Sequence, residues 1–244
     1  MNFEAFRQKC IDIFALNPIL PVPTDEQIEK LAKLTEIMLR VNESMNLTAI
    51  TEESAVILKH YADSLTILGD IPEGAKVIDV GCGAGFPCLP LAIFRPNIKI
   101  TALDSTAKRI DYVRNTAKEL GLDNLTAIAG RAEEYGNKPE YRQNFDIATA
   151  RAVAALPVLA ELCLPFVKVG GSFVAMKAAK GEDEASSAAN AIKLCGGSPA
   201  SVTKLELTAD NAAYESRIIV KTQKVASTPA KYPRHYSQIS KKPL

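Results

Sequence analysis

Tryptophan is absent from this sequence of 244 residues, histidine occurs only twice, and no run of about 18 apolar residues is present. Without such a run, no segment is predicted to cross a membrane as a helix. The five cysteines are an odd number and include no pair at C-x-x-C spacing, and two histidines are too few for an obvious zinc site. We therefore expect a cytoplasmic protein with reduced thiols and no metal ion.

Net charge is also scarce, because the whole chain carries only +1. The charge is unevenly spread, however. Residues 1–75 contain 6 Lys and Arg against 12 Asp and Glu, a net charge of −6, whereas residues 221–244 contain 6 Lys and Arg and no acidic residue, a net charge of +6. A basic segment on a neutral body can bind a polyanion, although a solvated terminus is the simpler interpretation.

The first 70 residues have the pattern of helices. Thr24 and Gln27 form a capping box, and apolar residues follow at helical spacing up to Met45. A second helical pattern covers ESAVILKHYADSLTIL, which begins at Glu53. We therefore predict a helical N-terminal extension over residues 1–70.

After a turn near Pro72 the pattern changes to alternating strands and helices. Short apolar runs predict strands at KVIDV, IKITALD, LTAIAG, FDIATA and GSFVAMK. Helical patterns lie between most of them, over residues 89–94, 107–120, 155–167 and 182–194. This alternation indicates an α/β fold with a mostly parallel, doubly wound sheet. Two last runs, SVTKLELTA and RIIVKTQK, have no long helix between them and are predicted to close the sheet as an antiparallel hairpin.

The stretch KVIDVGCGAGFPCLPLAIFRP places a glycine-rich turn directly after the first predicted strand, which ends at Val80. Ligands of doubly wound sheets bind beyond the carboxyl ends of the strands, and glycine allows the backbone to approach them closely. The spacing is G-x-G-x-G, and the third glycine of a dinucleotide fingerprint would fall on Phe86. Asp104 ends the second strand, where a carboxylate can accept ribose hydroxyl groups. An adenosyl ligand is favoured over NAD, while a turn that only lets the helix pack remains an alternative.

Several motifs resemble those of a known family. DVGCGAGFP and LDS resemble motifs of Rossmann-like class I S-adenosylmethionine-dependent methyltransferases. Together with NLTAIT, HYADSL, GRAEE, TARAVAAL and KYPR, in this order, they resemble the glucose-inhibited division protein B family of ribosomal RNA small subunit methyltransferases, from about Thr24 to the C-terminus. Cys88 stands where that family usually has glycine.

The resemblance implies S-adenosylmethionine as cofactor and transfer of its methyl group to N7 of a guanine in the decoding-region loop of 16S ribosomal RNA. It also implies cofactor contacts at Gly81, Phe86, Ala132, Glu133 and Arg151, with Gly83 in the same loop and Asp104 as the ribose-binding acid. Residues 71–226 would form the methyltransferase domain and residues 227–244 a basic tail. The implied partner is 16S ribosomal RNA or a small-subunit particle, and we expect a monomer.

Each of these residues also has a simpler interpretation. Phe86 would pack on a helix face, Asp104 would cap a helix, and Glu133 would be a solvated charge at a helix start. Arg151 would form an ion pair with Asp146 or Glu161, both acidic residues of nearby segments. His60 in HYADSL would line the site or, more simply, be a satisfied core histidine.

No catalytic residue can be assigned. Residues 149–152 read TARA, which differs from the N/D-P-P-Y pattern of adenine amino-group methyltransferases, and no P-C and T-C pair offers a nucleophile for cytosine. Guanine N7 carries no proton, so no general base is expected and catalysis would rest on alignment and water exclusion. A non-catalytic RNA-binding assembly factor and an NAD-dependent oxidoreductase are the alternative functions.

The tail offers two competing hypotheses. The three prolines of the tail suggest an extended conformation. In the first hypothesis the tail is a flexible arm that binds RNA phosphates through Lys231, Arg234, Lys241 and Lys242. Alternatively, KYPR would fold back and support the methyltransferase domain.

Overall fold

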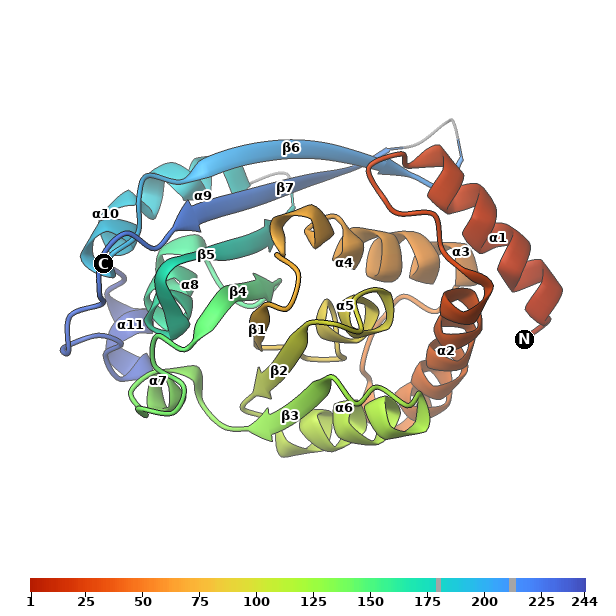
Figure 1. Ribbon diagram of the computed structural model, residues 1–244, viewed down its shortest axis with the longest axis horizontal. Coiled ribbons are helices and arrows are strands. Elements are labelled where there is room, and N and C mark those ends of the chain that lie inside the picture. The colour runs from red at the N-terminus through yellow and green to blue at the C-terminus, as the bar shows by residue number, and fades with distance from the viewer. Residues whose placement is uncertain (179–180, 211–213) are drawn as a thin grey trace.

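The computed structural model describes residues 1–178, 181–210 and 214–244, and a seven-stranded sheet runs through its centre (Figure 1). The strands are β1 (Lys76–Val80), β2 (Lys99–Asp104), β3 (Leu125–Ala129), β4 (Phe145–Arg151), β5 (Val167–Lys177), β6 (Ser201–Thr208) and β7 (Tyr214–Gln223). Their spatial order is β3-β2-β1-β4-β5-β7-β6. The first five strands are parallel, and β7 is antiparallel to both β5 and β6. The predicted α/β fold with a closing hairpin is confirmed.

Helices precede the sheet in the chain. They are α1 (Phe3–Leu16), α2 (Asp25–Met45), α3 (Glu53–Val56), the π-helix η1 (Ile57–Ala62), α4 (Asp63–Leu65) and the 3₁₀-helix η2 (Leu68–Asp70). The capping box of Thr24 and Gln27 opens α2 as predicted, because each residue satisfies a backbone N–H of the other. Among the described residues, no helix is both long and apolar enough to span a membrane.

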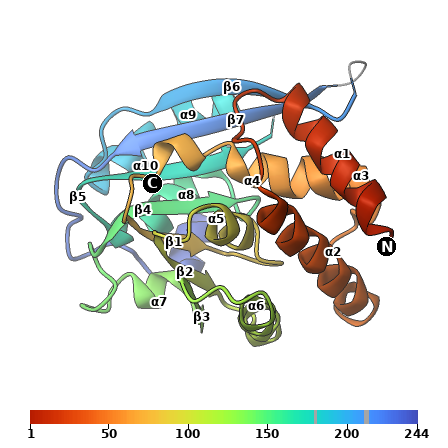
Figure 2. The same ribbon diagram turned by 45° about the vertical axis from the view of Figure 1, so that its right-hand side comes forward.

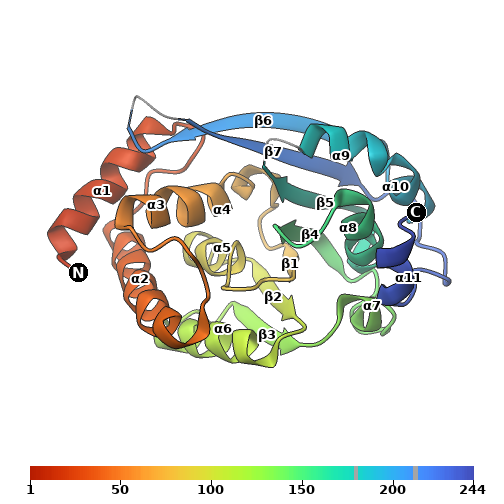
Figure 3. The ribbon, with the colours of Figure 1, turned by 180° about the vertical axis from the view of Figure 1, so that it is seen from behind.

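The remaining helices complete three layers. They are α5 (Cys88–Phe94), α6 (Ala107–Glu119), α7 (Ala132–Tyr135), α8 (Leu156–Cys163), the 3₁₀-helix η3 (Leu164–Phe166), α9 (Gly181–Ser187), α10 (Ala189–Leu194) and α11 (Tyr236–Lys241). In Figures 1 and 2, α1 to α6 lie on one side of the sheet and α7, α8, α10 and α11 on the other, and Figure 3 shows the same division from behind. The helix predicted over residues 155–167 ends early, since Pro165 falls in η3.

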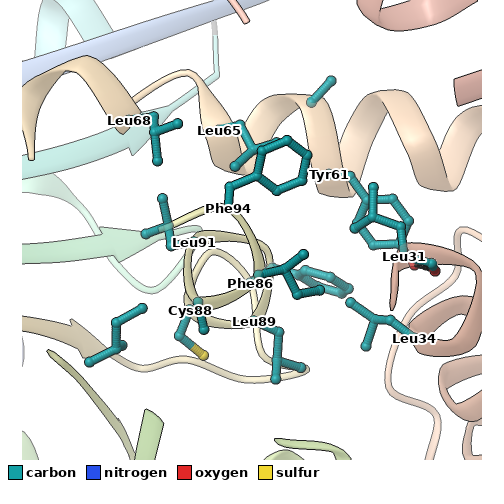
Figure 4. Close-up of a cluster of buried hydrophobic side chains, with 14 of the residues drawn as sticks. Leu31, Leu34, Tyr61, Leu65, Leu68, Phe86, Cys88, Leu89, Leu91 and Phe94 are labelled. Carbon is teal, nitrogen blue, oxygen red and sulfur yellow. Dashed lines mark hydrogen bonds between the residues drawn. The ribbon is translucent and has the colours of Figure 1, made fainter. Parts of the chain in front are cut away.

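Alternate strand residues divide the core into two clusters. Val77 and Ile147 pack into one cluster with the N-terminal helices, whereas Ile78 and Ala148 pack into the other with α8 and α10. Figure 4 shows how the first cluster joins the N-terminal helices to α5, with Leu31, Leu34 and Tyr61 meeting the side chains around Phe86. The N-terminal helices and one face of the sheet therefore share a hydrophobic core.

The C-terminal strap, residues 227–244, is not the extended tail that its composition predicted. Arg142 donates to the carbonyl oxygens of Thr228, Pro229 and Tyr232, and the strap ends in α11, whose Ile239 is fully buried. The expectation fails because backbone carbonyl groups that composition predicts to be solvated accept hydrogen bonds from the half-buried guanidinium of Arg142. The strap thereby packs against the α8 side of the sheet.

Candidate active site

An open cleft of about 1190 Å³ lies where the parallel strands end. Its lining includes the last residues of four strands, namely Val80, Asp104, Arg151 and Lys177. The segment after α2 covers another part of it with Leu47, Thr48 and Ile50. The cleft thus occupies the position at which doubly wound sheets bind ligands.

The glycine loop after β1 forms the floor of the cleft. Gly81 and Gly83 have φ angles of +76° and +55°, which favour glycine. The amide N–H groups of Gly81 and Cys82 both donate to the carbonyl oxygen of Leu103, at 2.7 and 3.1 Å. A Cβ on Gly81 would stand 2.6 Å from Cγ2 of Val153, whereas at Gly83 the nearest neighbour would be 3.9 Å away. The Gly83 backbone is therefore open to a ligand.

Asp104 ties this loop to the start of α6. Its Oδ2 accepts a hydrogen bond from the Gly83 amide at 3.0 Å, and its Oδ1 accepts one from the Thr106 amide at 2.8 Å. The interpretation as a helix-start group is therefore correct for one oxygen, although Asp104 also lines the cleft. Each carboxylate oxygen can accept a second hydrogen bond, so the capacity to bind hydroxyl groups remains.

Ala132 and Glu133, at the start of α7, line the same end of the cleft. The interpretation of Glu133 as a solvated charge is wrong, because the residue is only 5% exposed. Among the described residues its Oε1 has no hydrogen-bond partner, and Nη1 of Arg131 lies 3.8 Å away. Buried acceptors are nearly always satisfied, so Oε1 fits a ligand that donates a hydrogen bond.

Arg151 lies on the opposite side of the glycine loop. It forms an ion pair, as the simpler interpretation predicted, but its partner is not one of the two acidic residues that we expected. Its Nη1 donates to Oδ2 of Asp63 at 2.8 Å and to the carbonyl oxygen of Lys59 at 2.9 Å. Oδ1 of Asp63 accepts from Nε of Arg217, also at 2.8 Å. The expected partners are engaged elsewhere, Asp146 with Lys168 and Glu161 with Arg234.

His60 and Phe86 stack beside Arg151. Their ring centroids are 4.4 Å apart with an interplanar angle of 7°, and Cζ of Arg151 lies 5.3 Å from the Phe86 centroid. Nε2 of His60 is 3.0 Å from Oγ1 of Thr48. Burial, and then the charge of Arg151, lowers the pKa of His60 to about 3. Both interpretations of His60 are correct, because it is a buried group with a hydrogen-bond partner and it also lines the cleft. Phe86 likewise is buried and lines the cleft.

Asp79, in β1, is hydrogen-bonded to the start of α5, which follows the glycine loop. It is fully buried, and its Oδ2 accepts from the amide of Cys88 at 3.1 Å, whereas its Oδ1 has no hydrogen-bond partner in the part of the chain that the structure describes. Burial raises the pKa of Asp79 to about 7. The contact uses the backbone of Cys88, so the cysteine in place of a glycine leaves this connection intact.

The structure brings all seven predicted cofactor contacts to one cleft, namely Gly81, Gly83, Phe86, Asp104, Ala132, Glu133 and Arg151. The described lining includes none of the four predicted RNA-binding residues of the strap. Arg234 donates to the fully buried Glu161 from its backbone N, Nε and Nη2, at 2.9, 2.8 and 2.6 Å, so its guanidinium is not the free phosphate-binding group that we expected. Lys231, Lys241 and Lys242 are exposed.

Sequence reasoning missed the other charged residues of the lining. These are Lys59, Asp63, Arg109, Arg131, Lys177, Glu184 and Arg217, and Tyr236 of α11 joins them. Asp63 offered a signal, because it follows His60 by three residues in HYADSL, one helical turn away. Arg217 offered none, since it reaches Asp63 from the far end of the chain.

Residues 27–212 match the family model described as rRNA small subunit methyltransferase G. Relatives named ribosomal RNA small subunit methyltransferase G include that of Lactobacillus delbrueckii subsp. bulgaricus, 44% identical over the full length of both chains, and that of Alkaliphilus metalliredigens, 42% identical over 90% of this chain and 92% of the relative.

Solved structures share the fold at low identity. A putative O-methyltransferase from Klebsiella pneumoniae gives a TM-score of 0.55 at 15% identity over 84% of this chain and 92% of its own. A SAM-dependent O-methyltransferase from Thermotoga maritima gives 0.54 at 16% identity over 85% and 74%. Fold and sequence agree, and the chain belongs to the family of rRNA small subunit methyltransferase G.

Proposed function

We propose that the protein transfers the methyl group of S-adenosylmethionine to N7 of a guanine in 16S ribosomal RNA, within the decoding-region loop of the small subunit. One observation carries the proposal. All seven predicted cofactor contacts, most of them implied by the family resemblance, line a single cleft at the strand ends, in a chain that belongs to this family. The family membership also removes the support for an NAD-dependent oxidoreductase.

The chemistry of the cleft fits the proposed cofactor. Asp104 retains acceptor capacity for the two ribose hydroxyl groups, and the unpaired Oε1 of Glu133 suits the amino group of adenine. The open backbone at Gly83 allows the chain to approach the ligand closely. These three features lie together at the ends of β1 to β3.

The cleft has room for more than one molecule. Sites for a single small ligand usually enclose about 300–1,000 Å³. With about 1190 Å³, the cleft can hold the cofactor and still accept part of a nucleotide on the β4 and β5 side. A methyl transfer needs both at once.

Asp63 compensates the positive charge of Arg151, which would otherwise lie unbalanced in the cleft. When bound, S-adenosylmethionine supplies an electrophilic methyl group on a positively charged sulfur. A free arginine beside that charge would be repulsive, whereas here Asp63 accepts hydrogen bonds from both Arg151 and Arg217 at 2.8 Å. Arg151 thus keeps hydrogen-bonding capacity toward the ligands while much of its charge is compensated.

No group of the chain needs to move a proton in this reaction. Guanine N7 attacks through a lone pair and carries no proton. His60, whose pKa is lowered to about 3, stays neutral near pH 7. Its ring stacks on Phe86 and forms part of the wall of the cleft. The side chains would act by aligning N7 with the methyl group and by excluding water.

The test is transfer of tritiated methyl groups to free 16S ribosomal RNA, to partly assembled particles and to mature small subunits. Label in RNA from at least one of these substrates is expected, and the preferred substrate defines the assembly stage. Binding to the particles without transfer to any substrate would instead identify a non-catalytic assembly factor. The Gly81→Val variant serves as the control for cofactor-dependent labelling.

We also propose that the protein acts as a monomer in the cytoplasm, where small subunits are assembled. Light scattering of the free protein tests the oligomeric state, and a dimeric mass would contradict this proposal. Fractionation of cells tests the location.

A further inference from the structure

The part of the cleft at the end of β5 contains polar groups that have no role so far. Asp104, Ala132 and Glu133 lie at the ends of β2 and β3, on one side of the glycine loop. On the other side, Lys177 ends β5 and Glu184 lies on α9, and both line the cleft. If the residues at the ends of β1 to β4 hold the cofactor, the part at the end of β5 is the place for the target base.

Lys177 and Glu184 hold each other in a fixed arrangement. Nζ of Lys177 donates to Oε2 of Glu184 at 2.7 Å and to the carbonyl oxygen of Ala154 at 2.8 Å. Oε2 of Glu184 also accepts the backbone N–H of Leu156 at 2.8 Å. Both contacts fall on Oε2, and within the described residues Oε1 is the oxygen that remains for a ligand. The Lys177 side chain is only 10% exposed, so this orientation is enclosed by the protein.

The other carboxylates of the lining are committed elsewhere. Asp63 uses one oxygen for Arg151 and the other for Arg217 and is 4% exposed. Asp104 and Glu133 lie at the other end of the cleft, beside β2 and β3. Glu184 is therefore the carboxylate that remains for the target base within the described lining.

We propose that Glu184 is a specificity-determining residue that recognises the Watson–Crick edge of the target guanine. Oε1 accepts hydrogen bonds from N1–H and the N2 amino group, and Lys177 is a positioning residue that orients the carboxylate. This inference rests on the proposed function, because it takes guanine as the target. Adenine has an unprotonated N1 and no N2 amino group, so it would place a lone pair against the carboxylate.

The test compares RNA substrates that carry guanosine or inosine at the target position. Inosine retains N7 and N1–H but lacks the N2 amino group. For the unmodified protein we expect kcat/KM to fall about 10- to 100-fold with inosine, as for the loss of one hydrogen bond to a charged group. A ratio close to one would overturn the assignment without any variant, which guards against a variant that fails to fold.

Glu184→Gln gives the second arm of the test. Leu156 N–H and Lys177 still require an acceptor, so the amide oxygen faces them and the amide NH₂ faces the base, where it meets the N1–H and N2 donors. We expect kcat/KM for guanosine to fall at least about tenfold and the guanosine-to-inosine ratio to shrink below about threefold. Asp183→Asn is the matched control, because it removes the charge of an exposed residue that lies on the same helix but outside the described lining. It should leave the ratio unchanged.

The outcomes separate the two proposals. Methyl transfer by Glu184→Gln with an unchanged ratio would mean that Glu184 only anchors α9 to Leu156, and would overturn the recognition role alone. Absence of transfer to the guanosine substrate in every form, free RNA, partly assembled particle and mature subunit alike, would overturn the proposed function, and the guanine assignment with it.

Discussion

The two sides of the cleft are built in different ways. On the β2 side, the key contact joins the Gly83 backbone to Asp104, 21 residues away in the sequence. On the β4 side, Arg151 and Arg217 meet Asp63 across 88 and 154 residues. The β2 side depends on backbone conformation and on a contact between segments that are near each other in the sequence. The β4 side depends on ion pairs between segments that are far apart in the sequence. Substitutions in the glycine loop should therefore chiefly affect ligand binding, and substitutions that break the ion pairs of Asp63 should chiefly affect folding stability.

The largest effect is expected at Gly81. Valine there would have to adopt a φ of +76°, and its Cβ alone would stand 2.6 Å from Val153. We expect Gly81→Val to remove measurable affinity for S-adenosylmethionine in calorimetry while the protein remains folded by circular dichroism. Gly69→Ala is the control, since a Cβ at Gly69 meets nothing within 4 Å. Unchanged affinity of Gly81→Val would separate the glycine loop from the cofactor site.

On the β4 side, Asp63→Asn should chiefly lower stability. The substitution leaves two largely buried arginines without their shared carboxylate, which typically costs about 3 kcal/mol or more. Urea unfolding measures this loss. Asp25→Asn breaks the exposed pair with Arg7, which solvent screens, and should cost much less. Equal losses in the two variants would contradict the division between the two sides.

The strap should respond differently at its buried and its exposed cations. Arg234→Gln leaves the fully buried Glu161 without its cation, so we expect a loss of about 3 kcal/mol and a lower Tm. Replacing the exposed Lys231, Lys241 and Lys242 by Gln should leave Tm unchanged. If these lysines bind phosphates, the slope of log RNA affinity against log salt flattens by about one unit per lost contact. An unaltered slope would exclude them from the RNA interface.

The smallest net effect concerns pH, because His60 and Asp79 act in opposite directions and largely cancel. Burial lowers the pKa of His60 from 6.5 to about 3, so below pH 6.5 the unfolded chain binds a proton that the native chain rejects, and stability falls as pH falls. Burial raises the pKa of Asp79 from 3.8 to about 7, so in this window the native chain holds the extra proton, and stability falls as pH rises.

Two variants separate these contributions. Compared with the unmodified protein, His60→Gln should lose less stability when pH is lowered from about 6.5 to about 4.5, and Asp79→Asn should lose less when pH is raised over the same range. Urea unfolding at several pH values measures both. Curves parallel to that of the unmodified protein would show that neither group titrates with the shifted pKa.

The difference between the two sides also explains what the sequence could predict. The glycine loop and Asp104 were predictable because a strand, a turn and a following carboxylate lie close together in the chain and have few conformational options. The partner of Arg151 was not, because the choice among Asp63, Asp146 and Glu161 depends on how the N-terminal helices pack against the sheet. Glu184 was missed for the same reason, since its role depends on Lys177 and Leu156 in other elements.

The strap shows a second limit of composition. Its prolines and positive charges predicted an extended basic arm, and no local pattern indicated that Arg142 would bind three of its carbonyl groups or that Glu161 would be buried beneath Arg234. Such contacts arise only when distant segments are brought together. The competing hypothesis, in which KYPR folds back, describes the structure correctly for Arg234.

The activity itself is tested most directly by mass spectrometry of nucleosides from 16S ribosomal RNA. Small subunits prepared from cells that lack this protein are incubated with it and with S-adenosylmethionine carrying a trideuterated methyl group, and the RNA is then digested to nucleosides. We expect the deuterated methyl group in 7-methylguanosine and in no other nucleoside. Deuterium in a different methylated nucleoside, or in none with any assembly stage of the subunit, would contradict guanine N7 methylation.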